Sequence, residues 1–346
     1  MRARNVSALD AEFLTDGGQT AESVVAQLVG FIEASKRTIE VAIYDFHARV
    51  GASAQIADAL EAAVSRGVTV RVAFNVVRPT HPAAPRPMQS DPAGIDGLDV
   101  PTHGIHDQGS LMHHKYVVRD AETVWTGSTN WTDDAFSREE NAVIRLRDAT
   151  VAAAYGHNFE QLWTHRRLEA SGGAGEVVTM EGGLTVRPFF SPHGPSLAHL
   201  VADRMGAARR RVRILSPVVT SGVILGTLAE FAGRSSFDLA GAYDATQMEE
   251  VAAAWRSVPA NHWEIEAWRA IAPRLSGKRS TPYAEGSTHD YMHAKVLVAD
   301  VEVLTGSFNC SRNGESNAEN VLHVVSEPLA ERFAAFADSV AARYRS

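Results

Sequence analysis

The sequence predicts an α/β protein made of two similar halves, each with a mixed, mostly parallel sheet flanked by helices. Helical and β-rich stretches alternate along the chain, which is typical of sheets covered by helices on both faces. In addition, the stretch that begins at Phe13 is followed 176 residues later by a similar stretch at Phe189. The offset is 180 for His113 and His293, and this near-constancy indicates an internal duplication.

Hydrophobic periodicity and capping residues place the first elements. Thr20 is a typical helix N-cap, and Gly67 is a typical residue after a helix C-terminus. The predicted elements, in order, are a helix over 20–36, a strand over 38–46, a helix over 53–66 and a strand over 68–74. The proline-rich stretch 76–97 is predicted to be a long loop, which either rims the site or forms a surface insertion.

The same signals divide the rest of the chain. They predict a strand over 141–147, a helix over 149–167, a strand over 237–243 and helices over 223–232 and 246–258. Residues 1–170 are predicted to form an N-terminal domain, residues 171–183 a linker and residues 184–346 a C-terminal domain. The loop 272–289 carries Lys278 and Arg279, which either contact phosphate or form a solvated charged pair.

Each half contains the same polar pattern, His-x-Lys-x4-Asp, then Gly-Ser-x-Asn, then Glu-Asn. The residues are His113, Lys115, Asp120, Gly127, Ser128, Asn130, Glu140 and Asn141 in the first half and His293, Lys295, Asp300, Gly306, Ser307, Asn309, Glu319 and Asn320 in the second. A spacing of two places the histidine and the lysine on the same face of a strand. An imidazole beside an ammonium group suits a site that binds an anion and moves a proton, and phosphate esters are the commonest such substrates.

This duplicated pattern resembles the signature of the phospholipase D superfamily, and the resemblance covers nearly the whole chain. It implies two tandem phospholipase D-like α/β/α domains, related by a pseudo-twofold axis. It also implies that both motifs meet in one metal-independent phosphodiesterase site, which works through a phosphohistidine intermediate. On this basis we take His113 as the nucleophile and His293 as the general acid. The order of the two stays open, because the two copies are nearly equivalent in sequence.

The resemblance also implies roles for the other motif residues. The phosphate would be bound by Lys115, Lys295, Ser128, Asn130, Ser307 and Asn309. Glu140 and Glu319 would each orient one catalytic imidazole through its second nitrogen. Asp120 and Asp300 would be structural. A decayed pseudoenzyme is the alternative, but every catalytic position is present in both copies.

The sequence does not predict a metal site or any other cofactor. Histidines 103, 106, 113 and 114 crowd together, but the second copy keeps only His289 and His293, with no shared ligand spacing. The single cysteine, Cys310, excludes an internal disulfide framework and is interpreted as a packing residue rather than a reactive thiol.

Composition and charge limit the cellular location and the binding partners that we expect. There is no apolar stretch of signal-peptide length or membrane-spanning length, so we expect a cytoplasmic protein with no transmembrane segment. The net charge of −8 argues against a broad surface for polyanions, although it leaves room for a locally basic cleft.

Fold and motif do not choose the substrate. The shortness of the chain and the stretch 127–141, which looks like that of nuclease-type members, favour a nuclease (an endonuclease) with DNA or RNA as its substrate. A phospholipase D or phosphatidyltransferase acting on phospholipid headgroups is the first alternative. A non-catalytic module that binds nucleic acid or lipid is the second. The oligomeric state stays open.

Overall fold

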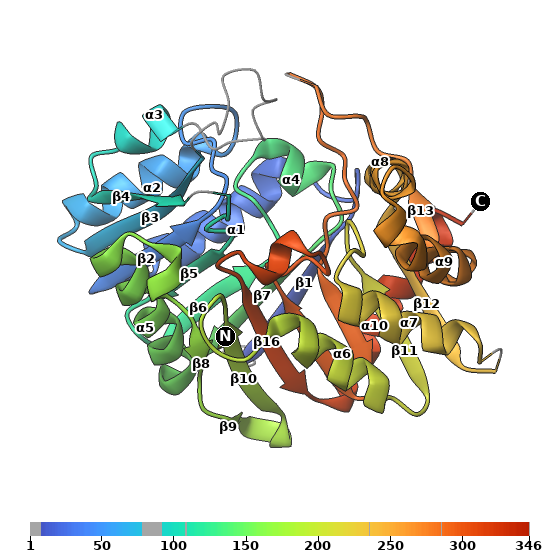
Figure 1. Cartoon of the computed structure of the whole chain (residues 1–346). Helices are drawn as coiled ribbons and strands as arrows, with labels where there is room; N and C mark the ends of the chain where they lie inside the picture. The colour runs from blue at the N-terminus through green and yellow to red at the C-terminus, as the bar shows by residue number, and fades with distance from the viewer. Residues whose placement is uncertain (1–7, 78–91, 108, 235, 285, 346) are drawn as a thin grey trace.

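The computed structural model of the chain describes residues 8–77, 92–107, 109–234, 236–284 and 286–345 (Figure 1). Most of the proline-rich stretch 76–97 therefore lies outside the described residues. The first half contains β1 (Leu9–Leu14), α1 (Ala21–Glu33), β2 (Thr38–Ile43), α2 (Ala54–Ser65), β3 (Thr69–Val77), α3 (Pro92–Asp96), β4 (Thr102–Asp107), β5 (Lys115–Arg119), β6 (Thr123–Gly127), α4 (Asp133–Ser137), β7 (Asn141–Arg147) and α5 (Ala149–His165).

The second half restarts the same series. Its elements are β8 (Gly173–Ala174), β9 (Val178–Thr179), β10 (Thr185–Phe190), α6 (Leu197–Ala207), β11 (Arg211–Leu215), α7 (Gly222–Ala232), β12 (Asp238–Asp244), α8 (Ala245–Arg256), α9 (His262–Ile271), β13 (Ser276–Lys278), β14 (Val296–Ala299), β15 (Glu302–Gly306), β16 (Asn320–Val325) and α10 (Glu327–Arg343).

The two sheets have the same strand order, which confirms the α/β fold in two halves. The first sheet runs β1-β7-β6-β5-β2-β3-β4, and the second runs β10-β16-β15-β14-β11-β12-β13 with β8 added next to β10. The similar openings at Phe13 and Phe189 lie in β1 and β10, which are corresponding strands. The internal duplication predicted from the sequence is therefore present in the topology.

The predicted predominance of parallel pairing is wrong. Within the described strands of the first sheet, only β2 with β3 and β3 with β4 are parallel, and the second sheet repeats this with β11, β12 and β13. Parallel neighbours need a crossover connection, and helices lie in these connections: α2 and α3 in the first half, and α7, α8 and α9 in the second. After that, β5, β6 and β7 follow one another through short connections and pair antiparallel.

Local signals explain why the first helix starts where it does. The side chain of Thr20 accepts a hydrogen bond from Ser23 N at the start of α1, as its N-cap role predicts. The apolar face of α1 buries Val24, Val25 and Leu28 against the first sheet. Gly67 has a φ of +86°, which an L side chain rarely adopts, so it allows the chain to turn from α2 into β3.

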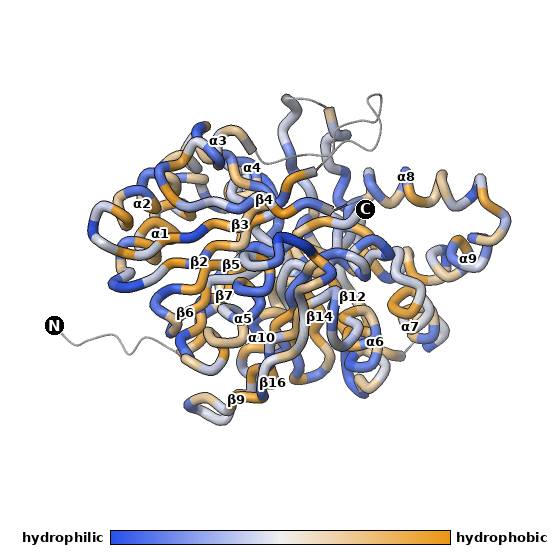
Figure 2. Tube along the Cα trace, turned by 60° about the vertical axis from the view of Figure 1, so that its left-hand side comes forward, coloured by the Kyte–Doolittle hydropathy of each residue, from blue (hydrophilic) through white to orange (hydrophobic). Residues whose placement is uncertain are grey.

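Three hydrophobic clusters hold the molecule together. One contains α1, α2 and the outer face of the first sheet, and another contains α6, α7, α9 and the outer face of the second. The third joins the halves, with Tyr155 and Phe159 of α5 and Phe333 of α10 packed among residues of both sheets. Orange, hydrophobic stretches therefore run through the interior in Figure 2. The active-site region is thus built on two sheets that share one core.

The segment 171–183, which is predicted to be a linker, contributes to the second sheet. Its short strands β8 and β9 both pair antiparallel with β10. Ser171 is buried and its backbone O accepts a hydrogen bond from His193 N. In the described ranges, none of the helices is both long and apolar enough to cross a membrane.

Candidate active site

Each histidine motif is held by the backbone of the opposite half. In front of β5, His113 N donates to Ala318 O over 2.9 Å, and Ala318 N donates to Leu111 O over 2.9 Å. The counterpart in the second half is a parallel bridge between Met292 and Glu140. These reciprocal bridges hold the two motifs at the junction of the halves, where Lys115 and His113 lie close enough to lower the pKa of His293.

The two motif lysines are buried beside the histidines. Lys115 is 2% exposed and Lys295 is 3% exposed. Each ammonium group donates to the backbone O of the histidine two residues earlier, over 2.7 Å for Lys115, which fixes both side chains in equivalent positions. Lys115 Nζ also lies 4.6 Å from the ring centroid of Tyr44, which in turn packs against His113. Tyr44 is a site residue that the motif does not reveal.

His113 is oriented by a carboxylate of the other half. Its Nδ1 lies 2.9 Å from Oε2 of Glu319, and both side chains are almost completely buried. An ionised carboxylate only accepts hydrogen bonds, so this contact places the hydrogen on Nδ1 and leaves the Nε2 lone pair free. Glu319 therefore takes the orienting position that the resemblance implies.

His293 has different partners. Its Nδ1 lies 3.1 Å from Oδ1 of Asn141 and 3.2 Å from Oε2 of Glu139. The amide orientation of Asn141 is set by its Nδ2, which donates to Ala135 O over 3.0 Å and to Glu139 over 3.1 Å. Oδ1 of Asn141 is therefore the acceptor, and Nδ1 of His293 is the donor.

Glu140 does not take the role implied for it, and this corrects the sequence-based assignment. Its carboxylate accepts hydrogen bonds from Lys278 Nζ over 2.9 Å, from the hydroxyl of Tyr344 and from Asp16 N. The strand register gives the reason. Ser128 N donates to Ala142 O, whereas Ser307 N donates to Asn320 O, so the first-half loop is one residue longer.

The longer loop makes Asn141, rather than Glu140, the counterpart of Glu319. The pairs are also exchanged between the halves. In the first half Nδ2 of Asn141 donates to Glu139, and in the second Nδ2 of Asn317 donates to Glu319 over 3.2 Å. The motif is therefore Glu-x-Asn in the first half and Asn-x-Glu in the second. As a result, the carboxylate of Glu319 holds His113, whereas the amide of Asn141 holds His293.

The motif serines are not free to bind phosphate, which is a second correction. Ser128 Oγ donates to Oδ1 of Asn141 over 2.6 Å and accepts from Ala142 N. Ser307 Oγ donates to Oε2 of Glu319 over 2.6 Å and accepts from Asn320 N. Both serines are 0% exposed. They hold the side chains of Asn141 and Glu319, which orient the histidines, so their effect on the site is indirect.

The motif asparagines have similar surroundings in the two halves. Oδ1 of Asn130 and Oδ1 of Asn309 are buried, and neither has a hydrogen-bond partner among the described residues. This equivalence between the halves agrees with a shared role. Their predicted role as amide donors to a phosphate therefore stays a prediction.

The motif aspartates lie away from the histidines and hold the backbone. The carboxylate of Asp120 accepts from the N–H groups of residues 36–38, and that of Asp300 accepts from the N–H groups of residues 209–211. Both aspartates have positive φ, +56° and +53°. Each thus fixes the turn before β6 or β15 to the start of the neighbouring strand, in agreement with a structural role.

Lys278 has neither of the roles considered for it, whereas Arg279 is in a solvated charged pair. Lys278 is 3% exposed, and it forms a buried ion pair with Glu140 and lies 3.4 Å from Asp16. Arg279 is an exposed partner of Glu249. Because the partners of Lys278 come from the other half, the sequence gives no local signal for this pair.

The histidine cluster near the first motif does not converge on one point. His103 stacks on Trp163, and His114 is buried with its Nδ1 3.3 Å from Asn320. Within the described ranges, no group of three histidine, cysteine or acidic side chains is placed to hold a metal ion. Cys310 is buried, and burial raises the pKa of its thiol to about 12.

Burial and mutual repulsion lower the pKa values of the motif histidines and lysines. Burial lowers the pKa of His113 to about 4 and that of Lys115 to about 7. The pKa values of His293 and Lys295 are lowered by burial and then by the neighbouring lysine charges. Conversely, burial raises the pKa of Glu139 to about 8. At His113 and Lys115, burial outweighs the attraction of the Glu319 carboxylate, so both pKa values stay low.

An anion in this site should be bound together with protons. Its negative charge raises the depressed pKa values of Lys115 and His293, so at pH 7.5 the bound state holds more protons than the free state. We expect an uptake of about one proton for each inorganic phosphate or tungstate bound. Calorimetry in two buffers of different ionisation enthalpy measures this number. Release of protons would contradict the electrostatic description, and Lys115→Met should reduce the uptake.

Comparisons with known proteins agree with this geometry. Residues 28–163 match a family model described as "Cardiolipin synthase, PLD-like domain". The chain is 33% identical over 143 residues to the mitochondrial cardiolipin hydrolase of Xenopus laevis, a match that covers 41% of this chain and 62% of that protein. The chain thus spans less than two thirds of the length of this relative.

Similar solved structures extend the likeness to both halves. The phosphatidylserine synthase of Haemophilus influenzae has a TM-score of 0.65 and 14% identity, covering 95% of this chain and 84% of that one. The polyphosphate kinase of Porphyromonas gingivalis has a TM-score of 0.55 and 10% identity, covering 94% of this chain and 49% of that one. At such identities the likeness shows the fold alone. With the family match, the relative and the duplicated motif, it supports the resemblance to the phospholipase D superfamily.

Proposed function

We propose that this protein cleaves phosphodiesters without a metal ion, through a covalent phosphohistidine intermediate. The observation that carries the proposal is the convergence of two imidazoles and two ammonium groups in one buried site, where the Nδ1 atoms of both histidines are engaged. A nucleophile, an acid for the leaving oxygen and positive charge for the phosphoryl oxygens are all present. Neither half supplies this set alone.

The exchanged partners of the histidines support His113 as the nucleophile. Nε2 of His113 would attack phosphorus while the bond to the leaving oxygen breaks and His293 Nε2–H gives its proton to that oxygen. The phosphorylated imidazole gains positive charge, which the carboxylate of Glu319, 2.9 Å from Nδ1, stabilises. Water would then attack phosphorus, giving a proton to His293 as the N–P bond breaks. An acceptor alcohol in place of water would give phosphatidyl transfer.

We further propose phospholipid, rather than nucleic acid, as the substrate. Several carboxylates flank the site. Asp45 is buried near Lys115, Asp134 accepts from His289 N, and Asp16 lies beside Lys278. With a net charge of −8, these groups oppose a long polyanion more than a single phosphodiester at a lipid headgroup. The names of the matched family model and of the relative, which both refer to cardiolipin, support the same choice.

A side-by-side assay in chelator tests this function. The substrates are vesicles of cardiolipin or phosphatidylcholine, single-stranded DNA, duplex DNA and RNA. We expect headgroup release from phospholipid at a rate that EDTA leaves unchanged. Cleavage of nucleic acid only would restore the nuclease expected from the sequence. Loss of activity in EDTA, with recovery on adding one metal ion, would contradict the mechanism. The cytoplasmic location stays a prediction.

A non-catalytic binding module is an outcome of the same assay. It would show binding of lipid or nucleic acid without product, and His113→Asn would then behave like the wild type throughout. The proposal instead predicts product from the wild type and none from this variant.

A further inference from the structure

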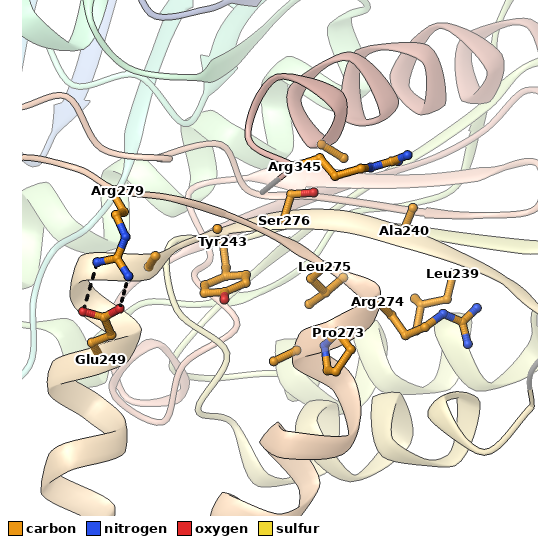
Figure 3. A pocket seen from close by; sticks show the side chains of 14 residues that line it. Leu239, Ala240, Tyr243, Glu249, Pro273, Arg274, Leu275, Ser276, Arg279 and Arg345 are labelled. Carbon is orange, nitrogen blue, oxygen red and sulfur yellow. Dashed lines mark hydrogen bonds and ion pairs between the residues drawn. The ribbon is translucent and has the colours of Figure 1, made fainter.

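A polar pocket lies at the edge of the second sheet, away from the histidines. It has a volume of about 680 Å³ and is formed by β12, β13, the start of α8 and the end of α10 (Figure 3). None of the motif residues lines it. A volume of this size is in the range of sites for small organic ligands.

The pocket lies around β13, the edge strand of the second sheet, whereas the proposed catalytic centre lies at the junction of the halves. Tyr243 lines the pocket, whereas the next residue, Asp244, accepts from Met292 N beside His293. Likewise Gly277 lines the pocket, whereas Lys278 faces Glu140. Ser276, which also lines the pocket, shares the strand face of Lys278, so the pocket takes side chains from both faces around the edge strand β13.

Three arginines give the pocket a positive charge. Arg345 forms no hydrogen bond or ion pair with the described part of the chain, and Arg274 uses one N–H, from Nη2, for Phe237 O over 2.6 Å. Arg279 pairs with Glu249, but both side chains are largely exposed, at 76% and 61%, so the pair contributes little stability. A guanidinium group has five N–H donors, and most of these remain available to an anion.

Neutral donors complete the pocket. Ser276 is 8% exposed, and its hydroxyl has no hydrogen-bond partner among the described residues. Figure 3 shows it next to Arg345 in that view. A Cβ at Gly277 would lie 3.0 Å from the hydroxyl of Tyr243, so the glycine keeps this wall of the pocket clear. Buried hydroxyls beside arginines are suited to phosphate oxygens.

We propose that this pocket is a second anion site, which binds an organic phosphate. The phosphate oxygens would be bound by Arg345, Arg274 and the hydroxyl of Ser276, and the organic part would lie against Leu275 and Pro273. Arginine forms bidentate hydrogen bonds with phosphate, which favours this ligand over a halide. The site does not depend on the proposed catalytic function.

Calorimetric titration of the full chain with glycerol 3-phosphate tests the proposal. We expect two sites in the wild type, one of which Lys115→Met removes. The double variant Arg274→Gln/Arg345→Gln should keep the catalytic site and weaken the other by at least about tenfold, because it loses two charge-assisted contacts. Arg167→Gln, which changes an exposed arginine of the first half, is the matched control.

The outcomes separate the two proposals. Unchanged binding in the double variant would overturn the pocket proposal, whereas unchanged binding in Lys115→Met would weaken only the catalytic one. If the double variant does not fold, Arg345→Gln alone, at an exposed position, should still weaken the second site by about threefold. Vesicles of phosphatidylglycerol identify the source. Pocket-dependent binding to vesicles alone would indicate a lipid headgroup, and binding of glycerol 3-phosphate would indicate a free ligand. Binding of neither would contradict the site.

Discussion

A His113→Asn variant is expected to lose turnover by at least about a thousandfold, because no other described group offers a lone pair at the same position. Nδ1 of His113 is held by Glu319, and its Nε2 is the atom left to attack phosphorus. Steady-state rates on the preferred substrate measure the loss. An asparagine keeps a polar side chain in the pocket, so the fold should be preserved, and thermal unfolding of the variant checks this.

The matched control is His165→Asn, which changes an exposed histidine at the end of α5. It should keep the wild-type rate. If His113→Asn retained a tenth of the activity or more, the assignment of His113 as the nucleophile would be wrong. The site with two histidines could still be correct.

Replacing Lys278 by methionine is expected to lower the free energy of unfolding by about 3–5 kcal/mol, because it leaves the carboxylate of Glu140 buried without its cation. The side chains of Lys278 and Glu140 are 3% and 1% exposed, so solvent cannot replace the lost partner. The pair also joins the halves, since Lys278 ends β13 and Glu140 precedes β7. Denaturant unfolding measures the change.

Two variants separate the buried pair from charge removal in general. Lys36→Met, at an exposed lysine, should change the free energy of unfolding by no more than about 0.5 kcal/mol. The double variant Lys278→Met/Glu140→Gln should recover much of the loss, because it removes the unpaired charge. A loss as small as that of Lys36→Met would contradict the buried ion pair.

The fold was predictable to the extent that local signals determine it. The capping of α1 by Thr20, the turn at Gly67 and the repetition after Phe189 all appear in the structure as predicted. The direction of strand pairing was not predictable from alternation alone. Strands β5, β6 and β7 follow one another without a crossover helix, and this makes the centre of the first sheet antiparallel.

The sequence predicted the histidines and lysines of the motifs, but not all of the side chains that hold them in place. Matching the two copies without a gap places Glu140 over Glu319, but the longer loop before β7 makes Asn141 the counterpart. The exchange of Glu-x-Asn for Asn-x-Glu was visible in the sequence and is the signal that could have identified Glu139. The burial of Lys278 against Glu140 depends on contacts between the halves, which no local pattern reports.

The central claim, that both halves form one site in which His113 attacks phosphorus, is tested most directly by trapping the intermediate. A His293→Asn variant is mixed with a phosphodiester whose leaving group needs no proton, such as a nitrophenyl ester, and is then digested at alkaline pH for peptide mass mapping. The account predicts a phosphoryl adduct, stable in base and labile in acid, on the peptide that contains His113, and no adduct in His113→Asn. An adduct on His293 in His113→Asn would reverse the roles. If neither variant formed an adduct, and the wild type turned over substrate without forming one, covalent catalysis would be contradicted.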